Sequence, residues 1–236
     1  MHRLLALLTL VAAFTFALVP VFTEPFTGFD PAHLPNPVGR LPIQPSGYAF
    51  AIWGVIYLWL IASAGYGLVK HGNDPDWAPH RPWLIASMAL GAAWIPVALA
   101  APVPATVMIF AMWATALIAL LKAPQTDPGF AIAPIGLYTG WLTAASFVAA
   151  ATVAAGYDIG SRISASWVAL AIALIAAVVI TRKTPTLAYP GAVIWALTGT
   201  MIANWNIFPA FATSAALGAL LLIAIGLGRR IDAARA

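Results

Sequence analysis

The stretch PSGYAFAIWGVIYLWLIASAGYGLV, residues 45–69, decides the class of this protein. It places two Trp, three Tyr and one Phe in an apolar run that has no charged residue before Lys70. A helix needs about 20 such residues to cross a hydrocarbon layer of about 30 Å. The run is continuous rather than alternating, which predicts a membrane-spanning helix and not a strand.

The composition of the whole chain points to the same class. Of its 236 residues, 62% are hydrophobic and 8% are charged, whereas a soluble domain carries roughly 25% charged residues. Such a chain cannot cover a surface that faces water, so an integral membrane protein is predicted. Cysteine is absent, which excludes disulfides and thiolate ligands.

Eight segments are long and apolar enough to span a membrane, where only helices and closed barrels satisfy the backbone. We therefore predict an all-α integral membrane protein with about eight transmembrane helices. The first segment resembles a secretory signal, but its apolar core exceeds the roughly 7–15 residues of such a signal and is interpreted as a retained span. The predicted spans are 4–22, 48–69, 83–99, 103–122, 132–155, 163–181, 186–205 and 208–228.

The basic residues provide an independent test of this span count. Eight spans place only Arg40 and Arg162 on one side of the membrane and the other nine Lys and Arg residues on the opposite side. Cytoplasmic loops carry the excess of positive charge, so both termini are predicted to be cytoplasmic, in a bacterial inner membrane. The nine are Arg3, Lys70, Arg81, Lys122, Arg182, Lys183, Arg229, Arg230 and Arg235.

Few residues in the predicted membrane region could carry chemistry. Apart from Lys122 at the end of one span, the eight spans contain no Asp, Glu, Lys, Arg or His, which argues against proton relays, ion-coupled transport and axial haem ligation. No His lies near an intramembrane Ser to form a nucleophile. His71 and His80 share a loop with Asp74 and Asp76, interpreted as solvated rather than metal-binding. The sequence predicts no enzyme, no metal site and no nucleic-acid partner.

The longest loop, residues 23–47, is rich in proline and too polar to span the membrane. A loop of this length is predicted to be an ordered lid, with a flexible linker as the alternative.

Aromatic side chains are the main candidates for a binding site. Phe50, Trp53 and Tyr57 lie at i, i+3 and i+7, on one face of the helix predicted above. Such a stripe can be a packed core or a stacking wall for a planar ligand, and composition does not separate the two. Four further indoles near span ends are interpreted as interfacial anchors. These are Trp77, Trp83, Trp167 and Trp205.

The aromatic residues also follow a recognisable order along the chain. Pro45, Tyr48, Phe50, Trp53 and Tyr57 mark the second span; Trp94 and Pro96 form W-x-P in the third; Trp113 lies midway in the fourth; and LYTGWLTAASF, residues 137–147, holds Tyr138 and Trp141 in the fifth. This order resembles the translocator protein / tryptophan-rich sensory protein (TspO/MBR) family, in its longer bacterial branch, over roughly residues 1–155. Where the family often has Asn, this chain has Gly91 and, late in the fifth span, Val148 or Ala149.

The resemblance implies a five-helix bundle that binds porphyrins, haem or sterol-like molecules between its helices. Residues 1–156, with the loop 23–47 as lid, would be this bundle, and residues 157–236 a three-helix C-terminal extension. Any cofactor is unknown, with haem or another tetrapyrrole as the implied candidate. The implied ligand-binding residues are Tyr48, Phe50, Trp53, Tyr57, Trp94, Trp113, Tyr138 and Trp141.

The leading hypothesis is therefore a non-catalytic membrane protein that binds, senses or transports a planar apolar ligand. The alternative is an accessory or structural subunit of a larger membrane complex, such as a photosynthetic or respiratory assembly. A facilitator for a neutral solute, using Asn204 and Asn206, is a third possibility. Expected partners are membrane lipids, the hydrophobic ligand, and a second copy of the chain or a larger complex.

Overall fold

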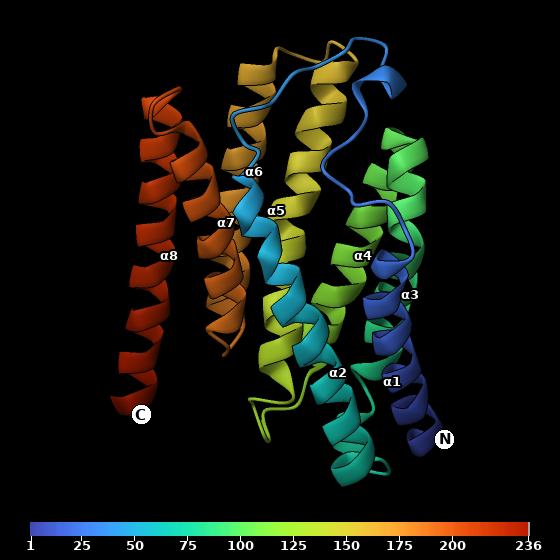
Figure 1. Ribbon diagram of the computed structural model, residues 1–236. Helices are drawn as coiled ribbons and strands as arrows, with labels where there is room; N and C mark the ends of the chain where they lie inside the picture. Colours follow the sequence, from blue (N-terminus) through green and yellow to red (C-terminus); the bar gives the residue numbers. More distant parts are fainter. Residues whose placement is uncertain (236) are drawn as a thin grey trace.

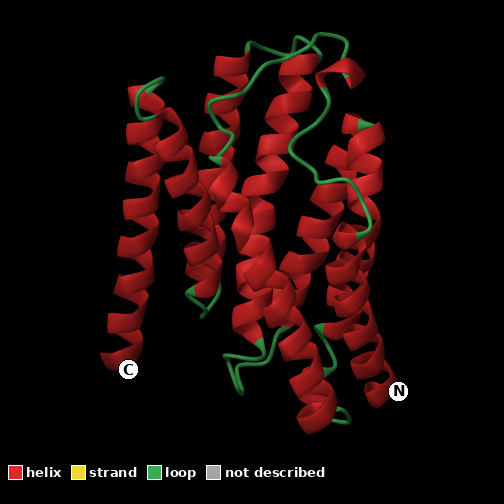
Figure 2. Ribbon diagram, viewed as in Figure 1, coloured by secondary structure: helices red, strands yellow, loops and turns green. Residues whose placement is uncertain are grey.

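The computed structural model describes residues 1–235. Residue 236, the last of the predicted C-terminal extension, lies outside the described residues, as do the side chains of Arg230 and Arg235 counted above. The described chain forms eight α-helices linked by loops and short 3-10 turns, and no strand occurs within it (Figure 2). The helices are α1 (His2–Leu18), α2 (Ile52–His71), α3 (Arg81–Ala100), α4 (Pro102–Lys122), α5 (Ile132–Gly156), α6 (Arg162–Lys183), α7 (Ala188–Asn204) and α8 (Pro209–Arg235).

These helices confirm the predicted helical membrane protein. Each coincides with one predicted span to within four residues, except that α8 continues seven residues beyond its predicted end. Seven of those described are long and apolar enough to cross a membrane. The exception is α7, whose 17 residues rise about 26 Å at 1.5 Å per residue. Proline begins the second helix at two short breaks, because Ala101 alone separates α3 from α4 at Pro102, and residues 205–208 separate α7 from α8 at Pro209.

Helix α5 lies at the centre of the molecule. Of its most apolar stretch 61% is buried, against 22–39% for the other spanning helices. Helices α1, α3 and α4 lie on one side of α5 and α6 to α8 on the other, while α2 crosses in front of α5 (Figure 1). α5 packs closely against α4, α6 and α7, so the predicted bundle and the predicted extension share this helix as a common wall.

Two glycines on α5 allow α7 to approach closely. A Cβ atom on Gly140 would lie 2.3 Å from the carbonyl oxygen of Tyr189, and one on Gly136 would lie 2.8 Å from the Thr186 side chain. This GLYTG sequence is a small-xxx-small motif, which lets backbones meet in a membrane. Beside it, the Tyr189 hydroxyl and Thr143 Oγ1 lie 3.0 Å apart, which adds a polar link between α5 and α7.

Both termini lie at the same end of the molecule (Figure 1). Buried Arg81 ties this end together, because its guanidinium donates to the carbonyl oxygens of Gly67 (3.0 Å), His71 (2.8 Å) and His2 (3.3 Å). Arg229 donates in the same way to the carbonyl oxygens at the end of α6. The last carbonyls of a helix have no partner within the helix. Arg81 therefore caps the end of α2 and joins it to the start of α1, and Arg229 caps the end of α6.

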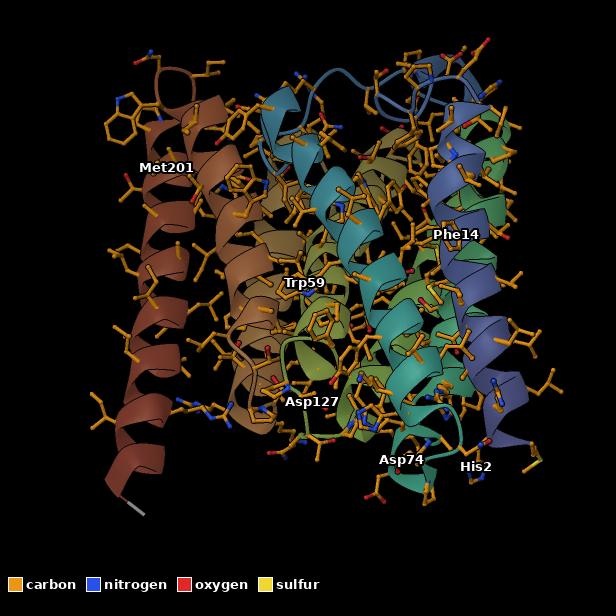
Figure 3. The ribbon with its side chains drawn as sticks, turned by 60° about the horizontal axis from the view of Figure 1, so that its bottom comes forward. His2, Phe14, Trp59, Asp74, Asp127 and Met201 are labelled. Carbon is orange, nitrogen blue, oxygen red and sulfur yellow. The ribbon has the colours of Figure 1, made fainter. Side chains whose placement is uncertain are left out.

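A cluster of titratable residues lies at this same end. His71 Nδ1 is 2.8 Å from Asp74 Oδ2, and its Nε2 is 3.0 Å from Asp127 Oδ2; Figure 3 shows His2, Asp74 and Asp127 at this end and Met201 towards the opposite one. The hydrogen bond from His71 holds the pKa of Asp74 below its usual value. The cluster links α2 to the α4–α5 loop, which sequence reasoning did not foresee.

Trp77 corrects one of the interpretations made from sequence. It lies near a span end, as an interfacial anchor would, but its ring is buried and stacks on His71 with centroids 4.3 Å apart. Its indole N–H donates to Thr126 Oγ1 at 3.3 Å. Trp77 is therefore part of the packing between the α2–α3 turn and the α4–α5 loop. The other three, Trp83, Trp167 and Trp205, are exposed.

Candidate functional site

A cavity of about 780 Å³ lies beneath the loop 23–47, which we call the lid loop. Every helix except α8 contributes to its lining. The volume falls within the roughly 300–1,000 Å³ of small-molecule sites. The cavity is therefore large enough for a ligand and is built by residues far apart in the sequence.

Aromatic rings form one wall of the cavity. Trp53 stacks on Tyr57, with centroids 5.3 Å apart, and the ring of Phe16 meets both edge-on at 5.8 and 5.1 Å. Phe50 and Trp53 in turn approach Trp141 edge-on at 5.7 and 6.2 Å. These distances are those of favourable aromatic pairs. The rings hold one another in place, which keeps the wall rigid.

The structure brings five of the eight predicted ligand-binding residues to the cavity. The stripe Phe50, Trp53 and Tyr57 lines it from α2 and the Gly47–Ala51 turn that leads into α2. Trp94 lines it from α3 and Trp141 from α5. One face of α2 and its preceding turn and two midspan indoles therefore line the same cavity, and their role in binding stays a prediction.

The other three predicted residues lie outside the lining. Tyr48 is 44% exposed and packs edge-on against Trp195. Tyr138 is fully buried behind the aromatic wall, with its hydroxyl 2.9 Å from Ser87 Oγ. Trp113 donates its indole N–H to Thr143 Oγ1 at 2.8 Å. Each satisfies its polar group or its packing within the protein, so its ring is not presented to the cavity.

Trp141 carries the most informative polar atom of the site. Its side chain is 2% exposed, and its indole N–H has no hydrogen-bond partner. Trp94, another cavity indole, donates to the Ala105 carbonyl oxygen at 2.9 Å. Burying a donor without a partner is costly. The protein itself covers this N–H, so an acceptor on a bound molecule would relieve it once the neighbouring side chains move aside.

The lid loop is tied to the helices on both sides of its middle. The Asn36 N–H donates to the Gly156 carbonyl oxygen at 3.0 Å, and its side-chain amide donates to Asp158 Oδ2 at 2.8 Å. Farther along, the Ser46 N–H donates to the Gly199 carbonyl oxygen at 3.1 Å. The loop is thus placed over the cavity by bonds to α7 and to the end of α5, as a lid requires.

Asn204 belongs to these ties and not to the cavity lining. Its buried amide donates to the carbonyl oxygens of Pro42 and Thr200, both at 2.7 Å. Asn206 is exposed at the end of α7. Neither lines the cavity, so the two do not form the polar path that a solute facilitator would need there.

Charge at the cavity is confined to the lid loop. Arg40 and Glu24 are the charged residues in the described lining. The Arg40 guanidinium donates to the Gln44 carbonyl oxygen at 2.7 Å and has no carboxylate partner within the described chain. Partial burial lowers the pKa of Arg40, although a guanidinium stays charged.

Sequence reasoning missed several lining residues. Phe16 comes from the first span, which carried no motif, and Phe26 comes from the lid loop, where its ring packs on Trp94 with centroids 4.8 Å apart. Gly91 had been noted only as a departure from the resemblance. A Cβ there would lie 2.3 Å from the Phe16 ring, so this glycine is what admits Phe16 to the cavity wall.

These features define a helical membrane protein with an aromatic-walled cavity under a tethered loop. A family model described as TSPO-like protein matches residues 3–228. The chain belongs to this family, as its aromatic motifs predicted. The match extends through α6 and α7 and into α8, beyond the residues 1–155 that the motifs covered. A search of curated proteins and a search of solved structures each gave no match.

Proposed function

We propose that this protein binds a planar apolar ligand that carries a hydrogen-bond acceptor, in the cavity beneath the lid loop. The family points to a membrane protein that binds or transports a ligand. The observation that carries the finer proposal is the unpartnered indole N–H of Trp141 beside a wall of aromatic rings. Flat polycyclic molecules such as tetrapyrroles or sterol-like compounds match this combination, because rings stack on rings and an acceptor satisfies the donor.

A tetrapyrrole with carboxylates suits the charged edge of the cavity as well. Arg40 can donate to a carboxylate at the lid while the macrocycle lies against Trp53 and Tyr57, because a guanidinium favours such partners. Chemistry on the ligand is not part of the proposal: the described lining offers no His, and its single carboxylate, Glu24, lies on the lid loop. We propose binding, in the service of sensing or transport, as the role.

Titration with protoporphyrin IX tests this function. Purified protein in lipid nanodiscs should show saturable quenching of Trp fluorescence. Trp141→Phe, which keeps a ring but removes the N–H, should weaken binding about tenfold, equal to the roughly 1.4 kcal/mol of a net hydrogen bond. Trp83→Phe removes an exposed indole outside the lining and serves as the matched control. Equal affinity in all three proteins would refute the proposal.

We further propose that the end carrying both termini is cytoplasmic and that the lid loop faces the opposite side of a bacterial inner membrane. The excess of basic residues at the termini end supports this orientation. Because the chain has no cysteine, single thiols can be introduced at exposed His33 and Gln125. An impermeant maleimide should label His33→Cys in intact cells and Gln125→Cys only after permeabilisation. The reverse pattern would overturn the orientation.

A further inference from the structure

The lining of the cavity changes its chemistry from one side of α5 to the other. On the side of α1 to α3 the lid loop and these helices supply aromatic rings, including Phe16, Phe26, Trp53 and Trp94. The helices on the opposite side supply none. Their lining residues are Leu170, Ala173 and Leu174 from α6 and Val193, Ala196, Leu197 and Thr200 from α7.

A strip of small residues on α5 joins the two parts. Ala144, Ala145, Val148 and Ala149 all line the cavity, and their spacing puts them on one face of the helix. The strip runs between Trp141 and Thr152, which also line the cavity. That separation of eleven residues corresponds to about 16 Å along the helix axis. The space is therefore elongated along α5, with rings on the side of α1 to α3 and aliphatic side chains on the side of α6 and α7.

Helices α6 and α7 are held firmly enough to serve as a second wall. α7 is locked against α5 at Gly136 and Gly140, where a Cβ atom would collide with Thr186 or Tyr189. The indole N–H of Trp195 donates to the Ala49 carbonyl oxygen at 2.8 Å, which joins α7 to the turn that precedes α2. The aliphatic wall is thus fixed relative to the aromatic one.

From this juxtaposition we propose that the ligand is a ring system bearing an aliphatic chain. The ring lies on Trp53 and Tyr57 with an acceptor at Trp141, and the chain extends along the small-residue strip to Leu170, Ala173 and Leu197. The inference rests on the proposed function and adds an aliphatic chain to the ligand proposed there. A bare ring would leave the α6–α7 side without a contact, and a simple acyl chain would leave the aromatic side and the Trp141 N–H unused.

The test compares two quinones that share one ring. The probes are 2-methyl-1,4-naphthoquinone and the same ring carrying a four-unit isoprenoid chain (menaquinone-4), titrated into nanodiscs by Trp quenching and expressed per mole fraction in the lipid. The isoprenoid chain moves from the lipid, which is apolar, into an apolar part of the cavity. Its contribution to affinity therefore comes from packing alone. We expect the chain-bearing quinone to bind about three- to tenfold more tightly.

Substitution of one α6 residue should then remove the difference. Ala173→Phe fills the aliphatic part and should bring the chain-bearing quinone to the affinity of the bare ring, without changing the latter. Ala171→Phe, on the exposed face of the same helix, should leave the preference intact. Leu197→Phe blocks the same space from α7 and replaces Ala173→Phe if that variant does not fold.

The outcomes separate this inference from the function on which it rests. Two results would contradict the proposed aliphatic chain of the ligand. One is equal affinity of the wild-type protein for the two quinones, and the other is a preference that survives both blocking variants. Such a result would leave the proposed function standing if the bare ring still binds and still depends on Trp141. Loss of all binding by ring compounds, with Trp141→Phe indistinguishable from wild type, would instead refute the function itself.

Discussion

Gly91 and Phe16 are complementary at the scale of single residues. The glycine on α3 leaves a space that the ring from α1 fills, and that ring then contacts Trp53, Tyr57 and Tyr138. An amino acid with a side chain at position 91 cannot coexist with the present position of the ring. The space left at position 91 is thus filled by an aromatic ring from another helix.

This exchange predicts a compensating pair of substitutions. Gly91→Asn alone should destabilise the protein by about 1–3 kcal/mol, the usual effect of overpacking, because the Phe16 ring must move. Adding Phe16→Ala should restore much of that stability. Denaturant titration of the two single variants and the double variant in mixed micelles measures the coupling. Strict additivity of the single effects would contradict the contact.

Arg81 shows where residue-level prediction from sequence reaches its limit. The sequence placed it correctly among the basic residues of one membrane side, since charge bias depends only on counts along the chain. Its burial and its three carbonyl partners depend on how α1, α2 and α3 meet. Tertiary packing of this kind leaves no periodic signal. The same holds for Phe16, whose neighbours in sequence are almost all apolar.

Close helix contact is the main feature at the scale of elements. The α5–α7 interface relies on Gly140, where an added methyl group would meet the carbonyl oxygen of Tyr189. A backbone atom cannot rotate away as a side chain can, so the helices themselves must separate. The sequence does contain a signal for this interface, the GLYTG motif at residues 136–140, but a small-xxx-small motif does not indicate which helix it meets.

Gly140→Ala is therefore expected to destabilise the protein by about 1–3 kcal/mol despite the higher helix propensity of alanine. Gly54→Ala on α2 is the matched control, because a Cβ at Gly54 meets nothing within 4 Å. Unfolding free energies in bicelles compare the two. A control that loses as much stability as the Gly140 variant would show that the interface is not responsible.

The ties between α7 and the lid loop suggest a kinetic experiment. Asn204→Leu keeps the branched shape of the side chain but removes its hydrogen bonds to the carbonyl oxygens of Pro42 and Thr200. We expect the rate of protoporphyrin release, followed by stopped-flow fluorescence, to rise about tenfold, as the loss of a net hydrogen bond allows. The exposed neighbour Asn206, changed to Leu, should release at the wild-type rate. An unchanged rate in Asn204→Leu would show that these ties do not limit release.

At the scale of the whole molecule, the eight helices of the described chain and their alternating direction followed from hydropathy and charge, and their boundaries followed except at the end of α8. Those properties act locally or by counting, which is why a single sequence sufficed. The cavity did not follow in full, since Tyr48, Trp113 and Tyr138 are turned to protein partners. Helical spacing indicates which residues share a face, but which face meets the cavity is decided by neighbouring helices.

The acid sensitivity of the molecule should reflect the cluster around His71. The pKa of Asp74 is lowered in the folded protein, first by the hydrogen bond with His71. Its contribution to stability is complete above the unfolded pKa of about 3.9 and is lost as the pH falls through the lower folded value. Denaturant midpoints measured between pH 3 and 6 should decline at the acid end. Asp74→Asn should show a shallower decline, and an identical profile would contradict this role.

The central position of α5 also has a mechanical consequence. Helix α8 contacts α6 and α7 but does not reach the cavity, so a force applied at the C-terminus should extract it first with little change elsewhere. Extraction of α7 would next strip the bonds that fix the lid loop. Once α5 is extracted, the remaining helices lose the helix against which they pack. A force–extension trace should then end in the extraction of these helices together rather than one at a time.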